Sequence, residues 1–178
     1  MVSSEAVPVQ RAASGAFDPP FRVGDKAPDF TLPDRKGTPH RLSQLVKRDT
    51  LLCFTCGCAN CIDLQSFTAI MLERLGKRAP DVITVTTMPT DREESYFRDT
   101  QLKQRLLYDR KGGSVVKQYV GHPCPRVYRL AADRTVTWIG SSPGETRALR
   151  KVGLELTAQL GFSPADAMSM QRTTRSTH

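Results

Sequence analysis

The sequence predicts an α/β fold with a central mixed β-sheet, helices on both faces and an N-terminal β-hairpin. Two observations carry this prediction. From residue 51 to residue 119, segments with strand character alternate with segments of helical periodicity, which is typical of parallel strands joined by helices. Two strand-like segments separated only by a polar turn follow at 127–139. Such a pair forms an antiparallel hairpin, so the sheet is expected to be mixed.

The expected strands are short and rich in β-branched, aromatic or leucine residues. An opening hairpin covers residues 30–42 and turns at Gly37. The closing hairpin turns at Asp133 and Arg134. The remaining strands are expected at 51–54, 82–86 and 106–108, and the arms of the closing hairpin at 127–130 and 136–139.

The expected helices are marked by their periodicity and their capping residues. A helix over 61–75 ends at Gly76 and has apolar residues on one face. Another, over 90–101, begins with the capping box of Thr90 and Glu93. A short helix covers 114–119, and a last one covers 142–160, beginning at Ser142, Pro143 and Glu145. The apolar face of the helix over 61–75 consists of Leu64, Phe67, Met71 and Leu75.

Length and composition indicate one globular domain, over residues 22–162, between disordered tails at 1–21 and 163–178. The formal net charge is +8, but the basic residues are scattered rather than gathered in a stripe with aromatics, so we expect no nucleic-acid partner. No apolar run approaches the length of a membrane span. The first 20 residues lack the apolar core of a signal peptide, so we expect a cytoplasmic protein without a membrane partner.

Four of the five cysteines lie within nine residues, in the segment LCFTCGCANC at 52–61. The segment ends in the CxxC pair Cys58 and Cys61, where the expected strand gives way to the expected helix. Two thiols at this spacing can close a disulfide, and a helix N-terminus favours the thiolate over the thiol. In a reducing compartment such a cluster indicates redox catalysis or metal binding more often than a structural disulfide.

Several segments resemble the redoxin, or alkyl hydroperoxide reductase and thiol-specific antioxidant, branch of the thioredoxin-like superfamily. The segment VGDKAPDFTL at 23–32 and the segment DRKGTPHRLSQL at 34–45 resemble the opening of these peroxiredoxin-like proteins. LYDRKGGSV at 107–115 is similar to their strand, turn and helix before the proline loop. GHPCPRVY at 121–128 is similar to the loop and strand that carry their cis-proline, and DRTV at 133–136 to the hairpin turn.

The resemblance implies an enzyme, a thiol-disulfide oxidoreductase with the thioredoxin-like fold and no cofactor. Cys58 would be the attacking thiol and Cys61 the resolving thiol. Pro125 would be the cis-proline, and the resemblance places Cys124 beside the CxxC pair with Cys56 nearby. The implied partners are a protein or small-molecule disulfide as substrate and a thiol as electron donor.

A thiol peroxidase that reduces hydroperoxides is the alternative function. Thr55 stands three residues before Cys58, as in the Thr-x-x-Cys of peroxiredoxins, where the threonine hydroxyl orients the peroxide. The proline expected before this motif is missing, and Arg126 is displaced from the place of the peroxiredoxin arginine, which Pro125 occupies. Thr55 is equally compatible with an ordinary strand residue.

A second alternative is a binding protein for a metal ion or an iron–sulfur cluster. Cys56, Cys58, Cys61 and Cys124 offer four thiolates, enough for Zn²⁺, Cu(I) or an iron–sulfur centre. His122 would add a nitrogen ligand or a general base, although a histidine in such a loop is more often solvated. The remaining cysteine, Cys53, lies within the apolar strand and is expected to pack as a small hydrophobic residue.

Overall fold

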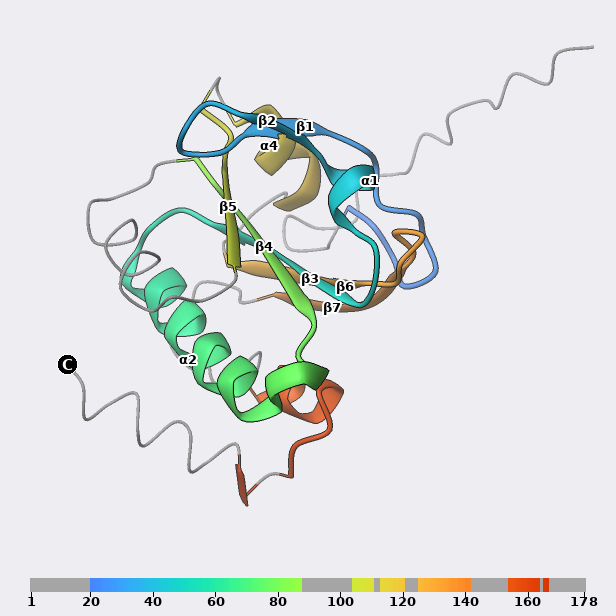
Figure 1. Ribbon diagram of the computed structural model, residues 1–178, viewed down its shortest axis with the longest axis vertical. Helices are drawn as coiled ribbons and strands as arrows, with labels where there is room; N and C mark the ends of the chain where they lie inside the picture. The colour runs from blue at the N-terminus through green and yellow to red at the C-terminus, as the bar shows by residue number, and fades with distance from the viewer. Residues whose placement is uncertain are drawn as a thin grey trace, which may run out of the picture.

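A computed structural model describes residues 20–87, 104–110, 113–120, 125–141, 154–163 and 165–166. Its main sheet has five strands in the order β5-β4-β3-β6-β7 (Figure 1). The central strand is β3, Thr50–Thr55, and it is buried along its whole length. β4 (Asp81–Thr86) and β5 (Gln104–Tyr108) run parallel to it. β6 (Arg126–Leu130) pairs antiparallel with β3, and β7 (Val136–Ser141) pairs antiparallel with β6. The predicted mixed sheet is confirmed.

A separate two-stranded sheet precedes the main one. β1 (Thr31–Pro33) pairs antiparallel with β2 (Pro39–Arg41). Gly37 in the connecting turn has a φ of 85°, a left-handed conformation that glycine adopts without the steric cost of a Cβ atom. The N-terminal hairpin and its turn are therefore confirmed, and the short helix α1 (Leu42–Leu45) follows directly.

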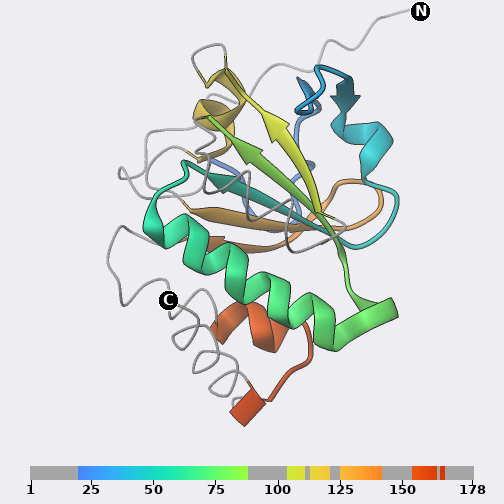
Figure 2. The ribbon, with the colours of Figure 1, turned by 60° about the vertical axis from the view of Figure 1, so that its left-hand side comes forward.

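Helices cover both faces of the main sheet (Figures 1 and 2). On one face lies α2 (Ala59–Leu75), beside the helical residues 154–159, with the short 3-10 helix η1 (Gly76–Arg78) after it. On the other face lie α4 (Ser114–Val120), α1 and the β1–β2 hairpin. A core fills each of the two interfaces: Leu64, Met71, Val127 and Leu156 on the α2 side, and Phe30, Leu52, Phe54, Tyr119 and Tyr128 on the α4 side.

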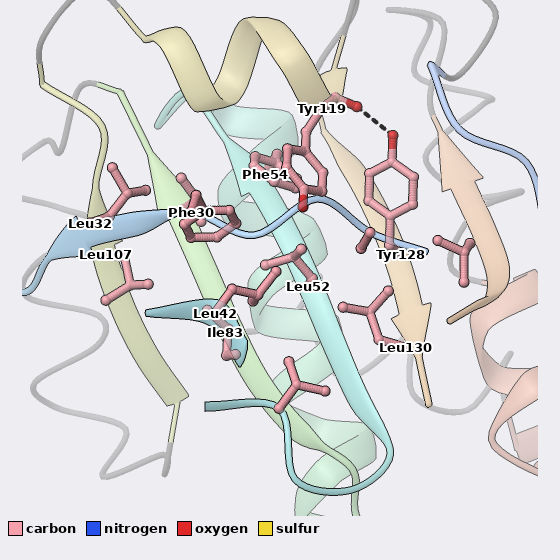
Figure 3. Packing of buried hydrophobic residues seen from close by; sticks show 14 of the residues in the cluster. Phe30, Leu32, Leu42, Leu52, Phe54, Ile83, Leu107, Tyr119, Tyr128 and Leu130 are labelled. Carbon is pink, nitrogen blue, oxygen red and sulfur yellow. Dashed lines mark hydrogen bonds between the residues drawn. The ribbon is translucent and has the colours of Figure 1, made fainter. Parts of the chain in front are cut away.

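The core on the α4 side is built around aromatic rings (Figure 3). Phe54 from β3 stacks on Tyr119 from α4, with ring centroids 4.9 Å apart. The hydroxyl of Tyr128 donates a hydrogen bond to the backbone carbonyl of Tyr119. Phe21 packs edge-on against Tyr119 at 5.0 Å, which ties the beginning of the described chain to this core.

The helices differ from the sequence prediction mainly at their ends. α2 begins at Ala59 rather than at residue 61, because Cys58 takes the N-cap position and allows one more half-turn. It ends at Leu75, before Gly76, as expected. Leu64, Met71 and Leu75 are buried as predicted, and the side chain of Phe67 lies outside the description.

Two predicted helices and both tails fall wholly or partly on residues outside the described ranges. The helix over 90–101 lies outside them altogether, and of the helix over 142–160 the described part, 154–159, is helical. The tails at 1–21 and 163–178 lie largely outside them as well, so the boundaries of the 22–162 domain stay a prediction. No helix among the described residues is long and apolar enough to cross a membrane.

Candidate active site

The chain reverses direction between the last residue of β3 and the first turn of α2. Thr55 ends the strand and is buried, and Cys56 follows it. Gly57 has a φ of 76°, in the left-handed region that favours glycine. Cys58 is then the N-cap of α2 with extended backbone, and its carbonyl accepts the first helical hydrogen bond, from the N–H of Ile62 at 3.1 Å. This turn sets three cysteines at the carboxyl end of the central strand, where open α/β sheets hold their sites.

The three thiols of Cys56, Cys58 and Cys61 meet around Cys61. Its Sγ lies 3.5 Å from Sγ of Cys58 and 3.8 Å from Sγ of Cys56. The backbone N–H of Cys56 also donates to Sγ of Cys61, at 3.4 Å. All three sulfur atoms lie within 4.8 Å of one another, close enough to share one metal ion. The expectation that Cys56 lies near the CxxC pair is thereby confirmed.

Exposure separates the members of this cluster. Cys58 is exposed, Cys56 is half-buried and Cys61 is fully buried, at 0% relative exposure. The arrangement offers one thiol to an incoming molecule and keeps its immediate neighbour out of solvent. A thiol that reacts with an external disulfide must be accessible, and its partner needs access only to the first thiol.

Cys53 differs from the other three in its position and its ionisation. It lies within β3, 5% exposed, and belongs to the core on the α2 side. Desolvation raises the pKa of its thiol to about 12, because burial penalises the charged thiolate. Its expected role as a small hydrophobic residue is confirmed.

Pro125 and Arg126 lie at the same end of the sheet as the thiols. Pro125 is buried and immediately precedes β6. Arg126 pairs in register with Phe54 on β3. It is fully buried. Burial raises the pKa of Tyr128 to about 12, and the nearby charge of Arg126 offsets only part of that rise. Because alternate strand residues face opposite sides, Arg126 shares the α4 side with Phe54 and Tyr128, whereas Thr55 faces the α2 side.

The structure brings together Cys56, Cys58 and Cys61 among the predicted site residues. Cys124 and His122 lie outside the described residues, so their approach to the CxxC pair and the cis bond before Pro125 remain predictions. The burial of Arg126 was missed by sequence reasoning, because an arginine at a strand start is normally solvated. The tight turn at Gly57 was missed as well. Its position between two cysteines was the available signal for a tight turn.

Comparison with known proteins gives the family. The AhpC/TSA family model matches residues 23–139, about two thirds of the chain. No curated protein sequence matches the chain. The matched segment includes the β1–β2 hairpin, the β3–α2 turn, all three clustered cysteines and most of the β6–β7 hairpin.

Solved structures give the same fold at low sequence identity. Peroxidoxin BcpB from Mycobacterium tuberculosis is 21% identical, with a TM-score of 0.58 over 85% of this chain and 96% of that one. A thiol peroxidase from Chromobacterium violaceum is 17% identical, with a TM-score of 0.58 over 78% and 89% of the two chains. A thiol:disulfide interchange protein from a Bacteroides species is 15% identical, with a TM-score of 0.59 over 82% and 94%.

The family match, the sheet order and the thiols at the start of α2 agree with one another, and they confirm the resemblance noted in the sequence. The chain therefore belongs to the AhpC/TSA family, with the thioredoxin-like fold and the thiol-based oxidoreductase chemistry of a redoxin.

Proposed function

We propose that this redoxin exchanges disulfides through Cys58 and Cys61, with Cys58 as the attacking thiol and Cys61 as the resolving thiol. One observation carries the proposal: the exposed Sγ of Cys58 lies 3.5 Å from the fully buried Sγ of Cys61. An exposed sulfur can reach a disulfide in another molecule. A buried sulfur in contact with it can reach the mixed disulfide that forms.

The reaction has two exchange steps that conserve atoms and electrons. The Cys58 thiolate attacks one sulfur of a substrate disulfide, forming a mixed disulfide and releasing the first substrate thiolate. Cys61, having given up its proton to that thiolate, then attacks Sγ of Cys58. The second substrate thiolate leaves, and the Cys58–Cys61 disulfide holds the oxidising equivalents. An external thiol donor returns the pair to the dithiol, and the cytoplasm is the compartment in which we propose that such donors act.

Two features of the turn support these steps. The backbone N–H of Cys56 donates to Sγ of Cys61, so it stabilises negative charge on the resolving sulfur when Cys61 loses its proton. The backbone N–H groups in the first turn of α2 have no acceptors within the helix. They stabilise the negative charge that develops on sulfur near Cys58 during each exchange step. Pro125 is proposed to border this site at the start of β6, with Cys124 as an auxiliary thiol.

The substrates we propose are disulfides in proteins or small molecules, with a thiol as the electron donor. The solved structures of similar fold include a thiol:disulfide interchange protein, which agrees with this class of substrate. The proposed site requires no metal or organic cofactor, because both redox equivalents reside on sulfur.

Peroxide reduction is the second candidate function, favoured by Thr55, which lies buried three residues before Cys58. A peroxide pocket also needs a positively charged donor aimed at the thiol. Arg126 lies at the same end of the sheet, but its strand position directs it to the α4 side and to Tyr128. We therefore expect peroxide oxidation of Cys58 to be no faster than that of an ordinary thiolate.

Two assays on the full chain test this ranking. Reduction of insulin by a thiol donor measures disulfide exchange, and stopped-flow oxidation by hydrogen peroxide measures peroxidase chemistry. We expect catalysis of insulin reduction, its loss in Cys58→Ser and in Cys61→Ser, and its retention in the control Cys53→Ala, which removes a thiol outside the cluster. Peroxide rates far above those of free thiols, with no insulin reduction, would reverse the ranking.

A further inference from the structure

The three clustered sulfur atoms surround a common point that the proposed dithiol reaction does not use. Cys56 comes from the end of β3, and Cys58 and Cys61 come from the start of α2. Sγ of Cys61 lies 3.5 Å from Sγ of Cys58 and 3.8 Å from Sγ of Cys56, and no two of the three sulfur atoms are more than 4.8 Å apart. Disulfide exchange by a CxxC pair requires two of these thiols, so the third needs a separate account.

The spacing matches a metal–thiolate site. A soft metal ion binds cysteine sulfur at about 2.3 Å. Three sulfurs in a plane around such an ion lie about 4.0 Å apart, and in a tetrahedral site about 3.8 Å apart. The sulfurs of Cys56 and Cys58 stand within half an ångström of these values from that of Cys61. Two of the three separations therefore already suit an ion, and the third, from Cys56 to Cys58, is at most 4.8 Å.

The donor set selects the class of ion. Thiolate ligands favour soft ions such as Cu(I) and Zn²⁺ over Mg²⁺, Ca²⁺ or Mn²⁺. Structural Zn²⁺ takes four protein ligands. The described part of the chain brings three sulfurs, with neither histidine nor carboxylate, into this group, and Cys124 lies outside the described residues. We propose that Cys56, Cys58 and Cys61 bind one Cu(I) ion as a three-coordinate thiolate site.

Burial suits such a site. The fully buried Cys61 and the half-buried Cys56 enclose the inner side of the ion, and the exposed Cys58 provides the route of entry. The backbone N–H of Cys56 lies 3.4 Å from Sγ of Cys61, where it offsets negative charge on the ligand set. Gly57, between two of the ligands, supplies the left-handed turn that brings Cys56 back towards the helix.

Metal binding and disulfide formation compete for the same atoms, and this inference goes beyond the proposed function. A Cys58–Cys61 disulfide removes two of the three ligands. Only the reduced protein is therefore expected to bind Cu(I), and bound Cu(I) is expected to block disulfide exchange until a competing chelator removes the ion.

The test is an anaerobic titration of the fully reduced full-length chain with Cu(I), supplied as its acetonitrile complex and competed with bicinchoninate. We expect one ion per chain and a shell of three sulfurs at about 2.3 Å by X-ray absorption. Cys56→Ser, Cys58→Ser and Cys61→Ser should each weaken affinity by about tenfold or more, since even outer-shell changes have effects of that size. Cys53→Ala should not weaken it, and Trp138 fluorescence checks that each variant is folded.

Three results would overturn the proposal. Unchanged Cu(I) affinity in Cys56→Ser would show that only Cys58 and Cys61 bind the ion. A loss of Cu(I) affinity in Cys124→Ser as large as in the other variants would show that four thiolates bind it. Tighter binding of Zn²⁺ than of Cu(I) in the same competition would show that the site prefers Zn²⁺. The titration involves no turnover, so failure of insulin reduction would leave its result unaffected, and failure of Cu(I) binding would leave the dithiol reaction standing.

Discussion

Cys53, Cys58 and Cys61 carry the same functional group within nine residues, and their surroundings give them different chemistry. Cys53 points into the core on the α2 side, Cys58 faces solvent at a helix N-cap, and Cys61 is buried against Cys58. Reactivity at a thiol requires both access and a stable thiolate. Cys53 has neither, which is why it serves as the control residue for the cluster.

Alkylation of the native protein should separate these cysteines. Burial raises the pKa of Cys53 to about 12, so between pH 7 and pH 9 it remains a thiol and is shielded from reagent. We expect iodoacetamide to label Cys58 first and to label Cys53 only after denaturation, as measured by peptide mass spectrometry at successive times. Labelling of Cys53 at a rate comparable to that of Cys58 in the native protein would show that the core around β3 opens readily.

At the scale of elements, the β3–α2 unit positions the site, and both ends of α2 are set by glycines. Gly57 precedes the helix with a φ of 76°, and Gly76 ends it with a φ of 54°. A side chain at either position is strained, because L-residues rarely adopt these conformations. Only Gly57 lies between two of the clustered thiols.

The two glycines therefore form a matched pair of substitutions. Gly57→Ala and Gly76→Ala should each lower the free energy of unfolding by about 1 kcal/mol or somewhat more. Only Gly57→Ala should also slow disulfide exchange, because it shifts Cys56 and Cys58 relative to Cys61. Urea unfolding followed by Trp138 fluorescence gives the stabilities, and insulin reduction gives the exchange rate. Equal slowing in both variants would mean that the rate follows stability and not the local turn.

The sequence was sufficient to predict the fold and the strands and helices that the structure describes, and insufficient for the side-chain geometry of the candidate site. The β-branched run at β4 and the glycine stop of α2 are local signals, so they could be read directly. The start of α2 was placed two residues late, because no side chain that normally caps a helix occurs at Cys58. The contact of Cys56 with Cys61 depends on the left-handed turn at Gly57, and the burial of Arg126 depends on its partner strand. Neither is encoded in local periodicity.

At the scale of the whole molecule, Asp29 joins three segments that are distant in sequence. Its carboxylate accepts hydrogen bonds from the backbone N–H of Ser43 at 2.9 Å, from its hydroxyl at 2.7 Å and from Nε of Arg41 at 2.6 Å. Arg134, in the turn between β6 and β7, lies 3.6 Å away. Desolvation raises the pKa of Asp29, but the bonds from Ser43 and Arg41 and the charge of Arg134 outweigh it and lower the pKa from 3.8 to about 2.

The lowered pKa of Asp29 determines how the stability of the fold changes with pH. A carboxylate with a lower pKa in the folded state stabilises the fold above pH 4, and this contribution is lost as the pH falls from about 4 to about 2. Asp29→Asn should therefore reduce the free energy of unfolding by about 1–2 kcal/mol at pH 7. The difference from the parent protein should shrink towards pH 2.

Urea unfolding followed by Trp138 fluorescence measures this difference, because Trp138 is the single tryptophan and packs against the core on the α2 side. The control Glu73→Gln removes one charge from an exposed position on α2 and should change stability little at any pH. A loss in Asp29→Asn that is the same at pH 7 and pH 2 would assign the effect to packing rather than to the ionised carboxylate.

The most direct test of the central claim, that Cys58 and Cys61 form the redox-active pair, is to map the disulfide after mild oxidation. The protein is oxidised with one equivalent of a small disulfide, its remaining thiols are blocked, and peptides are identified by mass spectrometry without reduction. The 3.5 Å contact predicts a Cys58–Cys61 link in most molecules, with Cys53 blocked as a free thiol only after denaturation. A main product that links Cys58 to Cys124, or that leaves Cys58 unpaired, would contradict this account.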